Sequence, residues 1–212
     1  MQNFLELAVS RRSIRKFQAK EIPDSELEYF IKCAISAPSG CNSQCWNFVA
    51  VRDREVIARI AQGVIAKTEA LLSSASTALT EEYLGSKRTM ATFFTKAPVV
   101  IAVFMTKADF YDKIEIAALK AAGYDEVGIM KLFANYDLLS IGAAIQNLLL
   151  AVQERGYGAC WMNEPAVAGV EINQILNIPL DQRFISLIPI GVPAYTPRAK
   201  QLKDLGQVFS IR

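Results

Sequence analysis

The sequence predicts an α+β fold in which helices and strands do not alternate regularly. Residues 98–106 are rich in Val and Ile and predict a buried strand. Residues 136–155 carry apolar side chains around so much of their circumference that the helix they predict must be buried on more than one side. The other predicted elements come in irregular runs, which favours α+β over a doubly wound sheet built from repeated β-α units.

The remaining elements follow from residue spacing and from stop signals. Asp24 is expected to cap a helix over 24–36, in which apolar residues recur at helical spacing and which ends before Pro38. Gly156 is expected to end the long helix. The other predicted elements are a strand at 47–52, a helix at 55–62, helical pieces within 63–96 and around 114–122, strands at 159–163 and 184–192, and a helix at 170–176.

Length and composition favour a single globular domain over residues 1–212. Hydrophobic residues make up 52% of the chain and charged residues 21%, which predicts large buried surfaces rather than disorder. The longest apolar run, 97–105, is far shorter than the roughly 20 residues that span a bilayer. The N-terminus lacks the features of a signal peptide. We therefore expect no membrane span and a cytoplasmic location.

The charge balance and the missing histidine exclude several classes of chemistry. With 23 basic and 21 acidic residues the chain has no broad positive face, so nucleic acid is not an expected partner. No histidine is present and the four cysteines form no Cys-x-x-Cys pair, so no metal site is expected. Every Ser-His or Cys-His nucleophile is also excluded, and any chemistry must depend on other residues or on a cofactor.

Three short segments carry residue types suited to binding a polar ligand. Residues 10–17 have the sequence Ser-Arg-Arg-Ser-Ile-Arg-Lys-Phe, and arginine presents a planar fork of donors that matches phosphate oxygens. Residues 37–46 form a loop of small and amide side chains closed by a tryptophan. Residues 191–200 leave a predicted strand through two prolines and carry Arg198 and Lys200. Taken alone, a basic segment of either kind is commonly just a solvated surface.

Together with a fourth segment, these motifs resemble in order those of the nitroreductase family of flavoenzymes. Residues 11–17 match Arg-Arg-Ser-x-Arg-x-Phe, and residues 37–46 match Ala-Pro-Ser-x-x-Asn-x-Gln-x-Trp. Residues 156–161 match Gly-x-Gly-x-x-Trp, and residues 191–200 match a basic C-terminal segment. The resemblance implies a central, mainly antiparallel sheet flanked by helices, in an intertwined homodimer packed around the helix at 136–155.

The resemblance further implies two FMN molecules at the subunit interface, in sites shared between the subunits. The implied phosphate ligands are Arg11, Arg12 and Ser13, helped by Arg198 or Lys200. Arg15 would stabilise the negative charge that reduction places near N1 and O2 of the flavin.

Two further groups of residues complete the implied site. The loop that meets the FMN of the neighbouring subunit is implied to use Pro38, Ser39, Asn42 and Gln44. On the flavin N5 and O4 side, either Asn163 or Glu164 would offer a backbone amide, because the proline that follows them cannot donate.

Two positions depart from the family pattern. Cys45 stands where proline is usual and shares its loop with Cys41, which leaves open a redox switch or a thiol that merely fills space. The glycine usual near Asn163 and Glu164 is missing, which leaves the amide that meets flavin N5 undecided.

The expected activity is transfer of electrons from NADH or NADPH to a small acceptor, such as a nitroaromatic or a quinone, by a ping-pong cycle. No basic residue decides between the two nucleotides. One alternative is a specialised family member that removes a halogen, oxidises a heterocycle or fragments flavin, with residues 107–128 as a lid insertion. The others are an FMN-binding protein without turnover and a helical homodimer without a cofactor.

Overall fold

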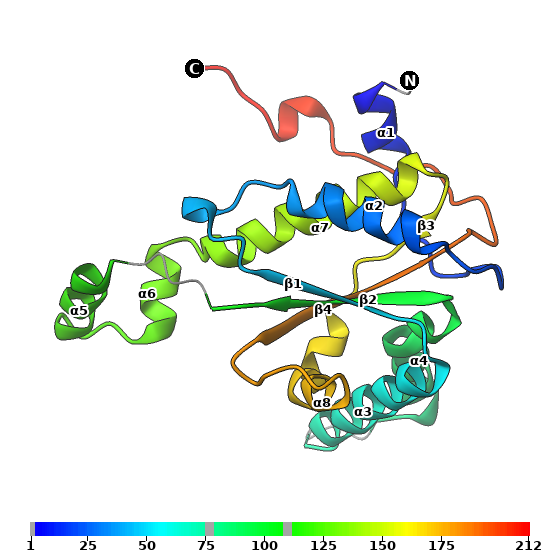
Figure 1. Cartoon of the computed structure of the whole chain (residues 1–212), viewed down its shortest axis with the longest axis horizontal. Helices are drawn as coiled ribbons and strands as arrows, with labels where there is room; N and C mark the ends of the chain where they lie inside the picture. Colours follow the sequence, from blue (N-terminus) through cyan, green and yellow to red (C-terminus); the bar gives the residue numbers. More distant parts are fainter. Residues whose placement is uncertain (1–2, 75–78, 108–111) are drawn as a thin grey trace.

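The structure is a computed structural model that describes residues 3–74, 79–107 and 112–212. In these residues four strands form one antiparallel sheet in the order β1-β2-β4-β3 (Figure 1). Its long central strands are two of those predicted from apolar runs. The strand bounds are β1 Trp46–Val51, β2 Val99–Met105, β3 Gly158–Ala159 and β4 Arg183–Gly191.

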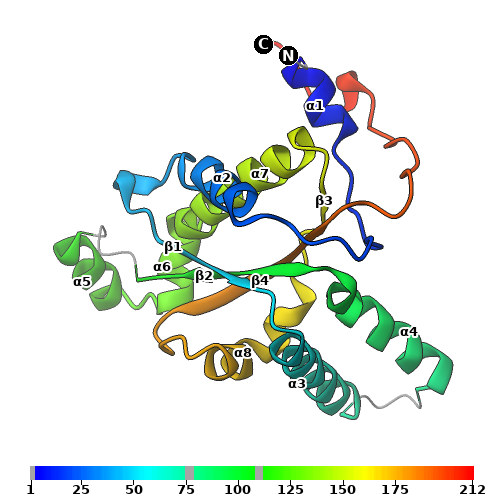
Figure 2. The same cartoon turned by 45° about the vertical axis from the view of Figure 1, so that its right-hand side comes forward.

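Helices cover both faces of this sheet (Figures 1 and 2), which confirms the predicted α+β class. One face packs against α2 and α7, and the other against α3, α4 and α8. Neighbouring residues of β2 belong to different cores, because Ile101 points to the first face and Ala102 to the second. The bounds are α2 Asp24–Ile35, α3 Arg54–Leu72, α4 Glu81–Thr92, α7 Tyr136–Glu154 and α8 Gly169–Ile175.

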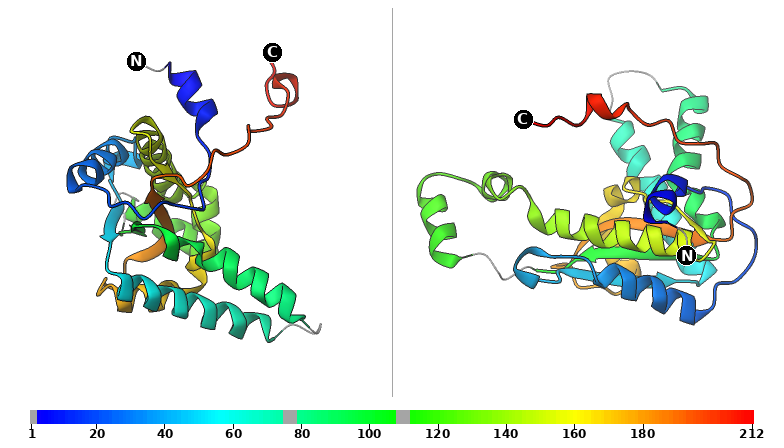
Figure 3. Two further views of the ribbon diagram at one scale, coloured as in Figure 1. Left: turned by 90° about the vertical axis from the view of Figure 1, so that its right-hand side faces the viewer. Right: turned by 90° about the horizontal axis from the view of Figure 1, so that it is seen from above.

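Three further helices lie outside these layers. The first, α1 (Phe4–Ser10), projects from the sheet on the same side as the C-terminal segment (Figures 1 and 3). At one end of the sheet, α5 (Lys113–Ala121) and α6 (Glu126–Leu132) occupy much of the predicted lid region, of which residues 108–111 lie outside the described part of the chain. No helix in the described ranges is long and apolar enough to cross a membrane.

The long helix α7 is buried on most of its circumference, as predicted, but one stripe is not. The side chains of Ile141, Ile145 and Leu148 are buried against the sheet, whereas Leu139 on the opposite side is 62% exposed. Asn147 donates a hydrogen bond to the Cys33 carbonyl at 3.2 Å and so joins α7 to α2. Gly156 ends the helix with a φ of 78°, the left-handed conformation that glycine adopts without strain.

Several helix ends differ from the sequence prediction. The N-cap of α2 is Pro23, with no side-chain hydrogen bond, and the predicted cap Asp24 is the first helical residue. The predicted helix at 55–62 continues to Leu72, because Gly63 lies inside the helix without breaking it. The helix α1 was not predicted; Asn3 and Glu6 cap its start reciprocally.

Candidate functional site

The N-terminal basic segment lies along the edge strand β3. Ser13 forms a parallel bridge with Ala159, and the Ile14 amide donates to the Ala159 carbonyl at 2.9 Å. A side chain at Gly158 would bring a Cβ within 2.5 Å of the Ile14 Cγ1 atom, a distance that real Cβ atoms do not show. Gly158 is therefore required for this close approach, and two of the sequence motifs meet here.

The segment that leaves β4 also pairs with the basic segment. Phe17 forms an antiparallel bridge with Pro193, and the Gln18 amide donates to the Val192 carbonyl at 2.9 Å. The pairing brings the beginning of the C-terminal motif against the end of the basic segment. Arg198 and Lys200 lie farther along, on exposed chain, and form no ion pair with any described residue.

The arginines of the basic segment have no acidic partner. Within the described residues Arg11, Arg12 and Arg15 form no ion pair. The Nη1 atom of Arg12 is buried and has no hydrogen-bond partner among the residues that the structure describes. Because a buried donor without a partner is costly, this guanidinium favours binding of an acceptor from outside those residues. The Arg15 guanidinium lies 5.9 Å from the centre of the Phe93 ring.

Cys160 lies directly beside these arginines, which sequence reasoning did not foresee. Its thiol is buried, and burial raises its pKa, while the nearby Arg15 guanidinium, the Ser13 hydroxyl and the Arg11 guanidinium act in the opposite direction. The residue occupies one of the unspecified positions of the Gly-x-Gly-x-x-Trp motif. Its place immediately before Trp161 in that motif was the signal that the sequence offered.

The loop at residues 37–46 is held against the start of α7. The Gly40 amide donates to the Ser140 hydroxyl at 3.2 Å, the Thr106 amide donates to the Cys45 carbonyl at 3.0 Å, and the Cys45 thiol lies 3.9 Å from the Asp137 carbonyl. Cys45 is buried while Cys41 is exposed. The loop thus has fixed ends and a free outer surface.

The backbone of this loop is unusual. Cys41, Asn42 and Gln44 have φ values of 50°, 55° and 46°. Non-glycine residues seldom adopt this left-handed region, and strained backbone of this kind is concentrated at functional sites. Pro38, Asn42 and Gln44 are exposed, whereas the Ser39 hydroxyl accepts a hydrogen bond from the Gln44 amide at 3.0 Å.

The predicted site residues therefore form two groups within one chain. The first group is the basic segment on β3, which follows the last turn of α7, and the second is the loop, which contacts the first turns of α7 (Figure 1). With 19 residues, α7 is roughly 28 Å long. A single small ligand cannot contact both groups at their places in one chain.

Asn163 and Glu164 belong with the first group. The segment that joins β3 to these residues runs alongside α7. Its Trp161 ring packs against the helix at Gly142, 3.6 Å from where a Cβ on that glycine would lie. Met162 then bridges to Leu187, and Glu164 begins a short 3-10 helix, Glu164–Ala168. Both residues are exposed and lie along the same edge of the sheet, farther toward the start of α7 than the bridge between Ser13 and Ala159.

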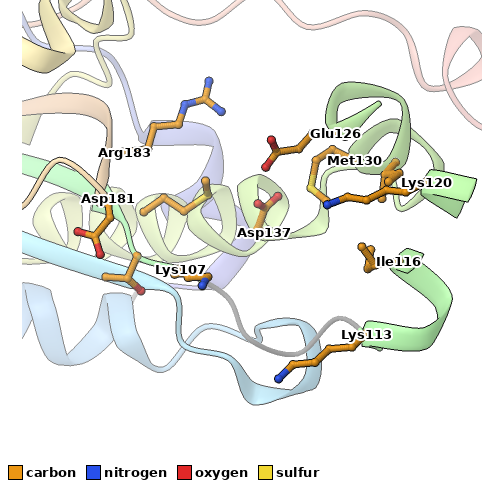
Figure 4. Close-up of a pocket in the computed structure, with 12 residues that line it drawn as sticks. Lys107, Lys113, Ile116, Lys120, Glu126, Met130, Asp137, Asp181 and Arg183 are labelled. Carbon is orange, nitrogen blue, oxygen red and sulfur yellow. The ribbon is translucent and has the colours of Figure 1, made fainter. Parts of the chain in front are cut away.

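A separate cavity of about 560 Å³ adjoins the second group (Figure 4). It lies between α5, α6, the start of α7 and the ends of β2 and β4. None of the residues that line it is among the predicted FMN ligands. Sequence reasoning placed a lid in this region but predicted no binding residue there.

The fold and the site define an α+β protein with a group of arginines along one edge of its sheet that form no ion pair within the part of the chain that the structure describes. Comparison with known families takes the assignment further. The sequence pattern of the nitroreductase family matches residues 8–192, and the chain belongs to that family.

Similar proteins carry more specialised descriptions. An iodotyrosine deiodinase from Thermotoga neapolitana is 27% identical, with 91% of this chain and 90% of the relative aligned. A BluB-like flavoprotein from Clostridium difficile 630 has a similar structure, with a TM-score of 0.85, 26% identity and full coverage of both chains. An iodotyrosine deiodinase bound to FMN and 3-iodo-L-tyrosine has a TM-score of 0.69 and 25% identity, with 98% of this chain and 97% of that one covered.

Proposed function

We propose that the protein is an FMN-dependent oxidoreductase that passes electrons from NADH or NADPH to a small acceptor, such as a nitroaromatic or a quinone. It would act as a homodimer with two FMN sites shared between the subunits. The observation that carries the proposal is the buried, unpartnered Nη1 atom of Arg12 within a group of unpaired arginines. A similar protein with bound FMN supports the choice of anion.

The residues of the first group fit a flavin phosphate. A phosphate carries close to two negative charges and several strong acceptor oxygens, which match the forked guanidinium groups of Arg11 and Arg12 and the Ser13 hydroxyl. Bonding to such an oxygen would satisfy the Arg12 Nη1 atom. Arg198 or Lys200 would complete the cradle from the exposed C-terminal segment.

The chemistry needs little from the protein beyond binding, orientation and electrostatics. Bound FMN would supply the redox step, taking a hydride from the nicotinamide and returning electrons to the acceptor. Arg15, three residues beyond Arg12 and directed toward Phe93, would stabilise negative charge on the flavin pyrimidine edge. A backbone amide of Asn163 or Glu164 would bond the N5 side. This division of labour agrees with a chain that has no histidine.

The division of the site into two groups supports sharing between subunits. Pro38, Ser39, Asn42 and Gln44 lie at the opposite end of α7 from the arginines, so a second copy would have to supply them to the same FMN. The chain also has apolar surface that a second copy could cover. It includes Leu139 on α7, Phe4 on α1 and Phe209 in the C-terminal segment, which are 62%, 71% and 57% exposed.

The protein as purified tests the proposal most simply. We expect it to be yellow, with one FMN per chain, and to lose the flavin absorbance when NADH or NADPH is added without oxygen. A screen of nitroaromatics and quinones against the reduced protein would then identify the acceptor. Protein that is colourless and stays so after incubation with FMN would overturn the proposal, and tight FMN without reduction by either nucleotide would indicate an FMN-binding protein without turnover.

A second candidate is a specialised reaction on the same cofactor, which the similarity to iodotyrosine deiodinases and to a BluB-like flavoprotein favours. The helices α5 and α6 would then form a lid specific to that reaction. Halide release from a halogenated tyrosine, or loss of the flavin when the reduced protein meets oxygen, would favour this candidate over general reduction of quinones and nitroaromatics.

A further inference from the structure

Charged groups of both signs line the cavity beside the start of α7 (Figure 4). We call Glu126 on α6 and Asp137 on α7 the acidic wall, and Lys113 and Lys120 on α5 the basic wall. Lys107, Asp181 and Arg183, near the ends of β2 and β4, also line the cavity, and its apolar lining residues are Met105, Ile116, Ile129 and Met130. A volume of about 560 Å³ lies within the range of pockets that hold small organic ligands.

Asp137 is the residue that points to a ligand. Its side chain is only 9% exposed, and its one hydrogen bond is accepted by Oδ1 from the neighbouring Leu138 amide at 2.7 Å. It forms no ion pair with any residue that the structure describes. A carboxylate buried without a cation or a set of donors is costly, so the cavity favours a ligand that brings a donor to it.

We propose that this cavity binds a bipolar molecule with a flat, apolar body. A protonated or N–H-bearing nitrogen at one end would bond Asp137, and a carboxylate or phosphate at the other end would face Lys113 and Lys120. The apolar body would lie on the Met and Ile side chains between the two walls.

The cavity is mechanically joined to the loop that would meet the flavin of the partner subunit. Asp137 and Thr106 both line the cavity; the Asp137 carbonyl contacts the Cys45 thiol, and the Thr106 amide donates to the Cys45 carbonyl. The inference deepens the proposed function and rests on it in this respect: the bipolar ligand would be the electron acceptor, or part of the reductant, held next to the partner's FMN.

Binding calorimetry with three related compounds tests the cavity without requiring flavin. The compounds are 4-(aminomethyl)benzoate, which has both charges, 4-methylbenzoate, which has only the acid, and benzylamine, which has only the ammonium. We expect the bipolar compound to bind at least about tenfold more tightly than either of the others, since a charge-assisted hydrogen bond contributes about that much. Equal affinities for the three compounds would overturn the proposal.

Two variants assign the binding to the two walls. Asp137→Asn keeps the acceptor for the Leu138 amide but removes the charge, and should abolish most of the advantage of 4-(aminomethyl)benzoate over 4-methylbenzoate. Lys120→Gln should weaken both acids by about threefold, because exposed ion pairs contribute little. Glu28→Gln and Lys32→Gln, at an exposed pair on α2, are the matched controls and should change nothing. An unchanged advantage in Asp137→Asn would contradict the assignment.

The visible spectrum of the FMN-loaded protein tests the link to the flavin. Saturation with 4-(aminomethyl)benzoate should shift the flavin absorbance bands in the native protein and not in Asp137→Asn. A ligand that binds by calorimetry but leaves the bands unchanged would overturn its placement next to the flavin. If the protein never bound FMN, the proposed function would be wrong. The calorimetric test of the cavity would remain valid, because it does not require flavin.

Discussion

The two groups of predicted site residues lie at opposite ends of α7 and are built in different ways. The arginine group lies on extended backbone that is bridged to β3, and its cations form no ion pair within the described ranges. The loop has three non-glycine residues in left-handed conformations and is fixed by hydrogen bonds to Ser140 and Thr106. The first group is suited to binding an anion on a fixed backbone. The second is a strained loop whose exposed side chains are suited to contacting a ligand held by another subunit.

The largest effect is expected from Gly158→Ala, which would disrupt the packing of the arginine-bearing segment against β3. The new Cβ would lie 2.5 Å from Ile14 Cγ1, so the basic segment must move away from β3. We expect a loss of about 1–3 kcal/mol of unfolding free energy, as in other overpacked sites, together with loss of FMN. Chemical denaturation and the flavin content of the purified protein measure both effects.

Gly85→Ala is the matched control for this substitution. Gly85 lies inside α4, and nothing stands within 4 Å of the Cβ that alanine would add. Alanine should stabilise the helix by roughly 0.5–1 kcal/mol and leave FMN binding unchanged. Equal effects of the two substitutions would show that the close approach at Gly158 has no special role.

Arg12→Ala is expected to weaken FMN without disturbing the fold. Removing one charge-assisted bond to phosphate should lower the affinity by about 1.5–3 kcal/mol, which is roughly tenfold to more than a hundredfold. Fluorescence titration of the apo-protein with FMN measures the change. Arg59→Ala, at an exposed position of α3, should have no effect, and a native affinity in Arg12→Ala would remove Arg12 from the phosphate site.

Substitutions at Asn42 separate strain from contact in the loop. Asn42→Ala keeps the left-handed φ of 55° at a cost of about 1–2 kcal/mol, whereas Asn42→Gly adopts it freely. Both variants lose the amide, so both should bind FMN more weakly, but only the alanine variant should lose stability. If the glycine variant bound FMN normally, the amide would not contact the cofactor.

The smallest effect concerns the buried thiol of Cys160, which lies near Arg11 and Arg15. Because burial raises the pKa of the Cys160 thiol above its ordinary value, the folded state holds the thiol proton more strongly than the unfolded state does. This contribution is complete below about pH 9 and is lost as the pH rises through the folded-state pKa. Cys160→Ser should therefore flatten the decline in unfolding free energy above that pH, while a matched Cys41→Ser should not. An identical decline in both variants would contradict the shift.

The sequence predicted much of this architecture because its signals are local. The buried strand at 98–106 and the helix at 136–155 are defined by their own apolar patterns, and the structure has them at nearly those limits. The nitroreductase motifs were likewise local, and the family they indicate is confirmed.

Features that depend on distant contacts could not be predicted in the same way. The proximity of Cys160 to Arg11 and Arg15 arises from a bridge between Ser13 and Ala159, which are far apart in sequence. Asp137 is buried beside a cavity whose other lining residues come from α5, α6 and the ends of β2 and β4, most of them distant in sequence. The helix α1 spans only seven residues, too few for its apolar spacing to define a helix, although Asn3 and Glu6 form a capping box at its start.

A mixed dimer tests most directly whether the two groups meet across subunits. One subunit carries Arg12→Ala and the other Asn42→Gly, and two different affinity tags isolate the heterodimer. If the sites are shared, each FMN contacts the arginines of one subunit and the loop of the other. Both substitutions then fall in the same site and the second site is intact, so the account predicts one tightly bound FMN per dimer and about half the native activity. If each site belonged to a single chain, both sites would be damaged, and a heterodimer with no tightly bound FMN would contradict the account.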